Sequence, residues 1–178
     1  MLRARERWRR RARERPASVV APGPGQESVW DYPRPPRLER SSKRVRVEWA
    51  GLAIADTQRA WRVCETASPP TYYLPLADVR RECLAPRSEE SLCEWKGIAR
   101  YWDLVHAGRV SSQAAWTVPE PFEEFAVLRD HVAFYPGRVD ACWLDEQGVT
   151  AQPGFFYGGW VTPDVTGPFK GEPGTEAW

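Results

Sequence analysis

Long apolar runs are absent from this 178-residue chain. No stretch approaches the roughly 20 apolar residues that a bilayer-spanning helix needs, and no short apolar region follows the basic N-terminus as it would in a secretory signal. We therefore expect no membrane contact and a cytoplasmic location. Hydrophobic residues make up 42% of the chain and charged residues 28%, which is ordinary for one globular domain.

Cysteine and histidine are too few and too scattered to indicate a metal site. The two histidines, His106 and His131, stand far apart, and no carboxylates cluster around either of them. The four cysteines include no pair with the C-x-x-C spacing of zinc knuckles and redox dithiols; they are Cys64, Cys83, Cys93 and Cys142. We expect no metal ion, no cofactor and reduced thiols.

Two catalytic motifs are also missing. The segment "GPFKGEPGT" contains Gly, Lys and Thr, but not in the order G-x-x-x-x-G-K-[ST] that cradles phosphates. No G-x-S-x-G sequence, which exposes the serine nucleophile of α/β-hydrolases, is present. The sequence therefore predicts neither a P-loop enzyme nor an α/β-hydrolase.

Lysine is rare, with 3 residues against 22 arginines, which we interpret as the codon bias of a GC-rich genome. Residues 1–16 hold eight Arg and two Glu, so the remainder carries 17 basic and 22 acidic residues. An Arg cluster attracts phosphates, but we favour a solvated tail or a misassigned start codon over a binding arm. Nucleic acid is thus not expected as a partner, except through residues 3–15.

Composition divides the chain into three segments. Residues 1–37 form a basic extension that becomes rich in Pro and Gly, as extended linkers are. Residues 38–150 carry the hydrophobic patterns of a folded domain. Residues 151–178 are rich in Gly, Pro and aromatic side chains, and we expect this tail to pack on the domain, because free linkers contain few aromatic residues.

Alternating apolar and polar residues predict a mainly β fold: a compact antiparallel domain of about eight strands with one short helix. The expected strands include "AWRVCET", "TYYLP", "VAFYP" and "VDACWLD". The helix is expected within residues 120–132 and a loop at residues 85–91. Residues 76–84 fit either a helical turn or a strand.

The clearest hairpin signal spans residues 44–57, with its turn at Ala50–Gly51. Opposite residues share a face, so Trp49 would pair with Leu52 and Val47 with Ile54. The core face would consist of Val45, Val47, Trp49, Leu52 and Ile54. The solvated face would consist of Arg44, Arg46, Glu48, Ala53, Ala55 and Thr57.

A second hairpin is predicted for "CEWKGIARYWDLVHAGRVSSQAAW", residues 93–116, with its turn at Ala107–Gly108. This turn would pair Val105 with Val110, Tyr101 with Ala114 and Ala99 with Trp116. That face is apolar, so we expect it to belong to the core.

The other face of the second hairpin mixes positive, aromatic and amide side chains, as the floor of a small-molecule site does. Lys96 would contact an anionic or carbonyl group and Trp102 would stack on the ligand, while Arg100 and Gln113 lie on the same face. The alternative is a sheet face covered by the C-terminal tail.

Neighbouring strands would supply the walls of this site. Glu65, Tyr73 and Tyr135 are expected there, and Lys96 with Glu65 is the candidate catalytic pair. A buried lysine beside a carboxylate is a common way to tune a pKa for chemistry. A purely structural ion pair is the alternative.

Five segments support a family resemblance: "RVRVEWAGLAIADTQRAWRVCET", "PPTYYLPLADVR", "CEWKGIARYWDL", "AAWTVPEPFEEFAVLRDHVAFYP" and "VDACWLD". In this order they resemble domain-of-unknown-function family 427 of bacteria and fungi, over roughly residues 38–148. The most specific element is W-K-G-x-A-x-Y-W, carried by Trp95, Lys96, Gly97, Ala99, Tyr101 and Trp102. The flanks "ESVWDYPRPPR" and "GGWVTPDVTGPFKGEPGT" are similar to those of actinobacterial members.

This resemblance implies a β-tent fold of two sheets, like those of methionine sulfoxide reductase B and zinc-binding exchange-factor chaperones. The C-x-x-C zinc pairs of those proteins are missing, and Cys142 lacks the His and Asn neighbours of a reductase nucleophile. We therefore do not carry the reductase activity over. The family also has a nucleotidyltransferase-like label.

These observations favour a small-molecule-binding β domain, or an enzyme without an assigned reaction, with its ligand in a cleft floored by the hairpin of residues 95–117. A nucleotidyltransferase-like enzyme is the first alternative, and it predicts dependence on a divalent metal. A protein-interaction module that acts through its aromatic tails is the second.

Overall fold

The computed structural model describes residues 15–175 and 178, and it confirms a mainly β fold of antiparallel sheets with short helical segments. The predicted basic arm of residues 3–15 lies, apart from Arg15, outside the described residues. The predicted boundaries of the three chain segments stay a prediction.

A seven-stranded sheet forms the centre of the fold, and every neighbouring pair in it is antiparallel. In sheet order the strands are β2 (Arg37–Arg40), β5 (Trp61–Cys64), β6 (Thr71–Pro75), β10 (His131–Phe134), β9 (Arg109–Thr117), β8 (Gly97–His106) and β7 (Leu84–Cys93). The four short strands β5, β6, β10 and β11 (Ala141–Leu144) confirm the strand predictions for these segments.

A four-stranded antiparallel sheet packs against one face of the central sheet. Its order is β12 (Gln147–Gly148), β11, β3 (Val45–Trp49) and β4 (Leu52–Thr57). The side chains between the two sheets form the main core, because alternate residues of each strand point to the same face. This core includes Val45, Val47, Tyr72, Leu74, Leu104, Val132, Phe134, Cys142, Leu144 and Trp160.

The opposite face of the central sheet is buried as well. Tyr73 and Ala133 lie one residue away from core side chains of the same strands, and therefore point to this second face. The 3-10 helix η4 (Glu123–Leu128) covers part of it with Phe125 and Leu128, which are 2% and 0% exposed.

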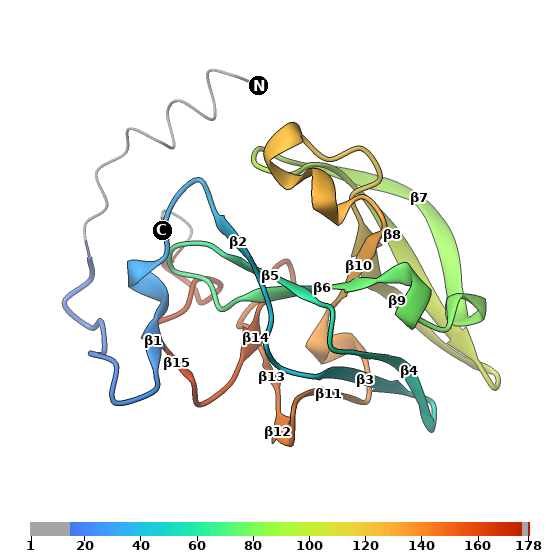
Figure 1. The fold of residues 1–178 in the computed structure, drawn as a ribbon, viewed down its shortest axis with the longest axis horizontal. Coiled ribbons are helices and arrows are strands. Elements are labelled where there is room, and N and C mark those ends of the chain that lie inside the picture. The colour runs from blue at the N-terminus through green and yellow to red at the C-terminus, as the bar shows by residue number, and fades with distance from the viewer. Residues whose placement is uncertain (1–14, 176–177) are drawn as a thin grey trace.

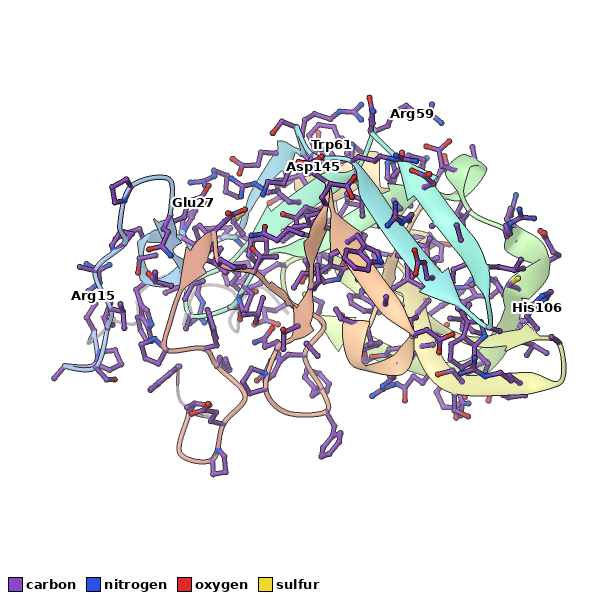
Figure 2. The ribbon with its side chains drawn as sticks, turned by 90° about the horizontal axis from the view of Figure 1, so that it is seen from below. Arg15, Glu27, Arg59, Trp61, His106 and Asp145 are labelled. Carbon is purple, nitrogen blue, oxygen red and sulfur yellow. The ribbon has the colours of Figure 1, made fainter. Side chains whose placement is uncertain are left out.

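The two ends of the described chain meet at one side of the molecule. The strand β1 (Glu27–Ser28), which precedes the 3-10 turn η1 (Val29–Asp31), pairs in parallel with β15 (Val165–Thr166), and Figure 1 shows both strands on the side away from β7. Figure 2 likewise shows Arg15 and His106 at opposite ends. The strands β13 (Thr150–Ala151) and β14 (Trp160–Val161) form a further antiparallel pair that places the C-terminal segment against the core.

The predicted register of the first hairpin holds for the two pairs next to the turn and is wrong beyond them. Trp49 pairs with Leu52 as expected, but Val47 pairs with Ala55 and Val45 with Thr57. A β-bulge in β4 inserts one extra residue. As a result both Ile54 and Ala55 are buried, at 0% and 1% exposure, and Thr57 is buried too.

The predicted register of the second hairpin was also wrong away from its turn. Val105 pairs with Val110 as expected, but Tyr101 pairs with Trp116 and not with Ala114. A larger bulge in β9 includes Gln113, whose φ is +51°. The shift is two residues, so Tyr101 and Trp116 still share a face.

Two loop and helix predictions need correction. Residues 85–91 are part of the long edge strand β7 and not a loop. The expected helix is present only as the short 3-10 segment η4, and His131, within the predicted helical range, begins strand β10. The undecided segment 76–84 contains two 3-10 turns, η2 (Leu76–Asp78) and η3 (Arg81–Cys83).

No helix within the part of the chain that the structure describes is long and apolar enough to cross a membrane.

The C-terminal segment contributes to the main core through Trp160, which is 1% exposed. Its indole donates a hydrogen bond to the Phe134 carbonyl at 3.2 Å and lies 5.0 Å from the Tyr72 ring. We expect Trp160→Ala to lower the free energy of unfolding by about 3–5 kcal/mol, as for other buried aromatic truncations, in urea denaturation. The matched control Phe155→Ala removes a side chain that is 94% exposed and should change it by less than about 0.5 kcal/mol. Equal effects of both substitutions would contradict the placement of Trp160.

Candidate functional site

A cavity of about 260 Å³ lies on the second face of the central sheet, away from the four-stranded sheet. Strands β5 to β9 with their adjoining loops, and Tyr135 just before η5 (Pro136–Arg138), supply one part of its lining, and the C-terminal segment supplies the rest. Its polar lining residues include Glu65, Tyr73, Ser91, Cys93, Lys96, Tyr101, Tyr135 and Lys170. This is the one place where most of the predicted site residues meet.

The sequence Trp95-Lys96-Gly97 explains how Lys96 is positioned. Trp95 is 1% exposed and anchors the turn between β7 and β8 in the second core. Gly97 has a φ of +116°, and a Cβ atom there would lie 3.0 Å from the Glu120 carbonyl oxygen, so a side chain is disfavoured. The backbone N–H of Phe122 donates to the Lys96 carbonyl at 3.0 Å. The turn therefore holds Lys96 at the cavity wall.

Lys96 keeps its charge although it is partly buried. Burial lowers the pKa of its ammonium group, but the Cys93 thiol, the Tyr73 hydroxyl and the Glu65 carboxylate act in the other direction, and the net pKa is raised. Among residues 15–175 and 178, no carboxylate oxygen lies within the 4.0 Å of a salt bridge to Lys96. Lys96 therefore offers a positive charge to the cavity that interacts with the Cys93 and Tyr73 side chains but is not paired in a salt bridge with any carboxylate of the described residues.

Tyrosine and tryptophan side chains build the wall around Lys96. The Trp116 indole donates to the Tyr73 hydroxyl at 3.0 Å, and Trp116 lies 4.5 Å from the Tyr135 ring. The Tyr101 hydroxyl lies 2.6 Å from the Ser91 hydroxyl. Burial raises the pKa of both Tyr73 and Tyr135, although Lys96 opposes the shift at Tyr73. These phenols stay neutral and can donate hydrogen bonds to a ligand.

Glu65 also lines the cavity, but it has its own cationic partner. The Arg34 Nε atom lies 3.2 Å from a Glu65 carboxylate oxygen, and Arg34 is only 6% exposed. Arg34 also donates a hydrogen bond from Nη2 to the Thr66 carbonyl at 3.0 Å. Because Arg34 offsets the charge of Glu65, Lys96 is not neutralised by it.

The C-terminal segment closes one side of the cavity without filling it. Gln152, Phe156, Tyr157 and Gly158 all contribute to the lining. Gly158 lies directly on the Trp116 ring: a Cβ atom there would be 2.2 Å from the ring edge. The Gln152 side chain accepts a hydrogen bond from the Gly159 N–H at 3.0 Å and fixes this approach.

Four of the seven predicted site residues line the cavity: Lys96, Glu65, Tyr73 and Tyr135. The other three do not. Trp102 packs against the main core and donates to the Thr117 hydroxyl at 3.1 Å. Arg100 is exposed and pairs with Glu90 at 2.8 Å, and Gln113 lies in the β9 bulge.

The prediction for the second hairpin was right in placing Ala99, Tyr101 and Trp116 in a core, but wrong in placing the ligand site on the opposite face. The face with Ala99, Tyr101 and Trp116 was expected to be core and lines the cavity, whereas the face with Trp102 and Leu104 meets the four-stranded sheet. The reason is that both faces of the central sheet are covered, so an apolar face does not identify the main core.

Sequence reasoning missed Cys93, Tyr101, Trp116 and the C-terminal wall. One signal was available for Cys93, because it stands three residues before Lys96 in "CEWKG", across a tight turn. For Gly158 and its neighbours the sequence shows only a Gly-rich tail.

A second cavity of about 490 Å³ lies beside β2 and β14, but most of its charged side chains are already in ion pairs. Arg62 contacts Glu27 at 2.8 Å and also contacts Glu39, and Lys43 contacts Asp164. Within the described ranges, no three His, Cys, Asp or Glu side chains are grouped to hold a metal ion. The Lys96 cavity is therefore the stronger candidate site.

Gly158 provides a test of how tightly the C-terminal wall packs. We expect Gly158→Ala to lower the free energy of unfolding by about 1–3 kcal/mol, because its methyl group would overlap the Trp116 ring. The matched control is Gly148→Ala, whose Cβ atom would lie an ordinary 3.6 Å from the Trp143 ring. Urea denaturation of both variants is the measurement, and a neutral Gly158→Ala would refute the close approach.

The comparisons with known proteins identify the family of the chain. No curated protein matches the chain. A family model described as a domain of unknown function, DUF427, and labelled NTP_transf_9 matches residues 37–145. The matched span includes Lys96, Glu65, Tyr73 and Tyr135, and it ends before the C-terminal wall. The match covers more than half of the chain and confirms the resemblance found in the sequence: the chain belongs to the DUF427 family.

Proposed function

We propose that this chain binds a small organic anion in the Lys96 cavity. One observation carries the proposal: a charged lysine lines a cavity that the C-terminal segment closes on one side, and among the described residues no carboxylate lies within salt-bridge distance of it. The neighbouring side chains keep this lysine charged, but no carboxylate among the described residues forms a salt bridge with it. An anionic ligand would supply the missing partner.

The size and lining of the cavity narrow the ligand class. Its volume of about 260 Å³ lies just below the range of roughly 300–1,000 Å³ for typical ligand pockets, which suits a small metabolite. Lys96 would bind a carboxylate or phosphate group, and the phenols of Tyr73 and Tyr135 would donate further hydrogen bonds. The Trp116 ring would contact the apolar part of the ligand.

We further propose that the same residues could carry out catalysis on the bound ligand. Lys96 and Glu65 stay the candidates because both line the cavity. Lys96 can also polarise a carbonyl oxygen, since stabilising developing negative charge is a strong catalytic effect. The free cysteines support a reducing compartment such as the cytoplasm.

Nucleotidyl transfer is the second candidate, and the label of the family model supports it. Such an enzyme binds a nucleotide together with a divalent metal. Nucleotides with and without magnesium therefore belong in the ligand screen. The third candidate, an interaction module, is supported by Phe155 and Phe156, which are 94% and 70% exposed at the C-terminal wall.

A thermal-shift screen against small carboxylates, phosphates, sugars and nucleotides tests the proposal. We expect organic anions to raise the melting temperature of the wild type, and Lys96→Met to weaken their binding roughly 10- to 100-fold, because a charged hydrogen bond is lost. Lys96→Arg should retain part of the effect. Arg100→Gln is the matched control, since it removes an exposed charge outside the cavity and should leave binding unchanged.

Three outcomes would contradict the proposal. They are equal shifts in wild type and Lys96→Met, a shift from nucleotides that depends on magnesium and not on Lys96, and no shift with any anion. The last outcome would favour the interaction module, for which Phe155→Ser and Phe156→Ser would then be tested against binding partners.

A further inference from the structure

The cavity holds a thiol beside its cation. Cys93 is the last residue of β7 and Lys96 precedes the first residue of β8, so the two flank the same tight turn, in which Cys93 pairs with Gly97. Both residues line the cavity. The Cys93 thiol is close enough to Lys96 to affect the pKa of its ammonium group. A nucleophilic atom and an anion-binding group thus face the same ligand space.

Cys93 differs from the three other cysteines in its access to solvent. Cys64, Cys83 and Cys142 are 0%, 1% and 2% exposed. Burial raises the pKa of each of these thiols, in the case of Cys64 to about 12. Buried thiols of this kind are inert. Cys93 is partly exposed, and the space that it faces is the cavity.

We propose that Cys93 is a nucleophile that forms a covalent bond with electrophilic small acids held by Lys96. This inference rests on the proposed function, because Lys96 must bind the acid group. The fitting ligand class is an aldehyde or keto acid, whose carboxylate contacts Lys96 while its carbonyl carbon lies against the thiol.

The reaction is an addition that needs no further reactant. The sulfur of Cys93 forms a bond to the carbonyl carbon, the π bond of the carbonyl group breaks, and the thiol proton ends on the carbonyl oxygen as a hydroxyl group. The product is a thiohemiacetal or thiohemiketal. No atom leaves and no electrons are gained or lost, so the adduct is reversible.

Two alkylating probes test the pairing of thiol and cation. Iodoacetate carries a carboxylate and iodoacetamide does not, while both react in the same way: a carbon–sulfur bond forms, iodide leaves and the thiol proton goes to solvent. We expect one adduct on the folded protein, located at Cys93 by peptide mass mapping and absent in Cys93→Ser. The ratio of the iodoacetate rate to the iodoacetamide rate should exceed that of glutathione by about tenfold, because Lys96 attracts the carboxylate.

The role of Lys96 is tested by variants and by salt. Lys96→Met should reduce the rate ratio to that of glutathione, and Lys96→Arg should restore most of it. In the wild type, an increase from about 0.05 M to about 0.5 M sodium chloride should lower the ratio, since salt screens the attraction. The salt series needs no variant, so it stays decisive if Lys96→Met fails to fold.

The carbonyl chemistry is tested by protection. Glyoxylate, the smallest aldehyde acid, should slow the labelling of Cys93 by iodoacetamide, and dilution should reverse this effect. Acetate has the carboxylate without the aldehyde and should protect less. Equal protection by the two compounds would overturn the covalent step.

The result that overturns the inference differs from the failure of the proposed function. A rate ratio equal to that of glutathione, or labelling at a cysteine other than Cys93, would refute the role of Cys93. If organic anions still raise the melting temperature of the wild type in that case, the binding proposal stands alone. If neither effect is seen, both proposals fall.

Discussion

Burial of the central sheet on both faces determines where the rest of the chain can lie. In β6, Tyr72 and Leu74 point toward the four-stranded sheet while Tyr73 points to the opposite side. The first side is closed by a second sheet, which fits a pleated surface well. The other side is closed by a short 3-10 helix and by the Gly-rich C-terminal segment. These cover a flat sheet less completely, and the cavity lies where their coverage ends.

Strand alternation and turn residues are local properties, so the sequence predicted most strands and both hairpin turns, at Ala50–Gly51 and Ala107–Gly108. The bulges were not predictable in this way. Gln113 has a positive φ without being a glycine, and its N–H donates to the Asp103 carboxylate at 2.7 Å. This contact joins neighbouring strands after they pair, so it stabilises a register that neither strand specifies alone.

The site was predictable in its residue types and only partly in its location. Lys96 was identified because it stands on the hairpin face that mixes positive, aromatic and amide side chains. Trp116 and Tyr101 were assigned to the core because aromatic side chains usually belong there. Their polar atoms distinguish Trp116 and Tyr101 from ordinary core residues. The Trp116 indole hydrogen-bonds to Tyr73, and the Tyr101 hydroxyl hydrogen-bonds to Ser91. Such pairing depends on three-dimensional neighbours and is not visible in one sequence.

The charge of Lys96 is better explained by binding than by stability. A salt bridge that is partly buried contributes little net stability, and an apolar side chain of similar size often serves the fold equally well. Elsewhere in the protein the charges follow the stabilising pattern, since Arg34 lies against Glu65 and Arg62 against Glu27. Lys96 departs from that pattern in the wall of a cavity, with phenols and a thiol around it. Positions whose chemistry the stability of the fold does not explain are typically functional, and under the proposed function the counterion of Lys96 would be an anionic ligand.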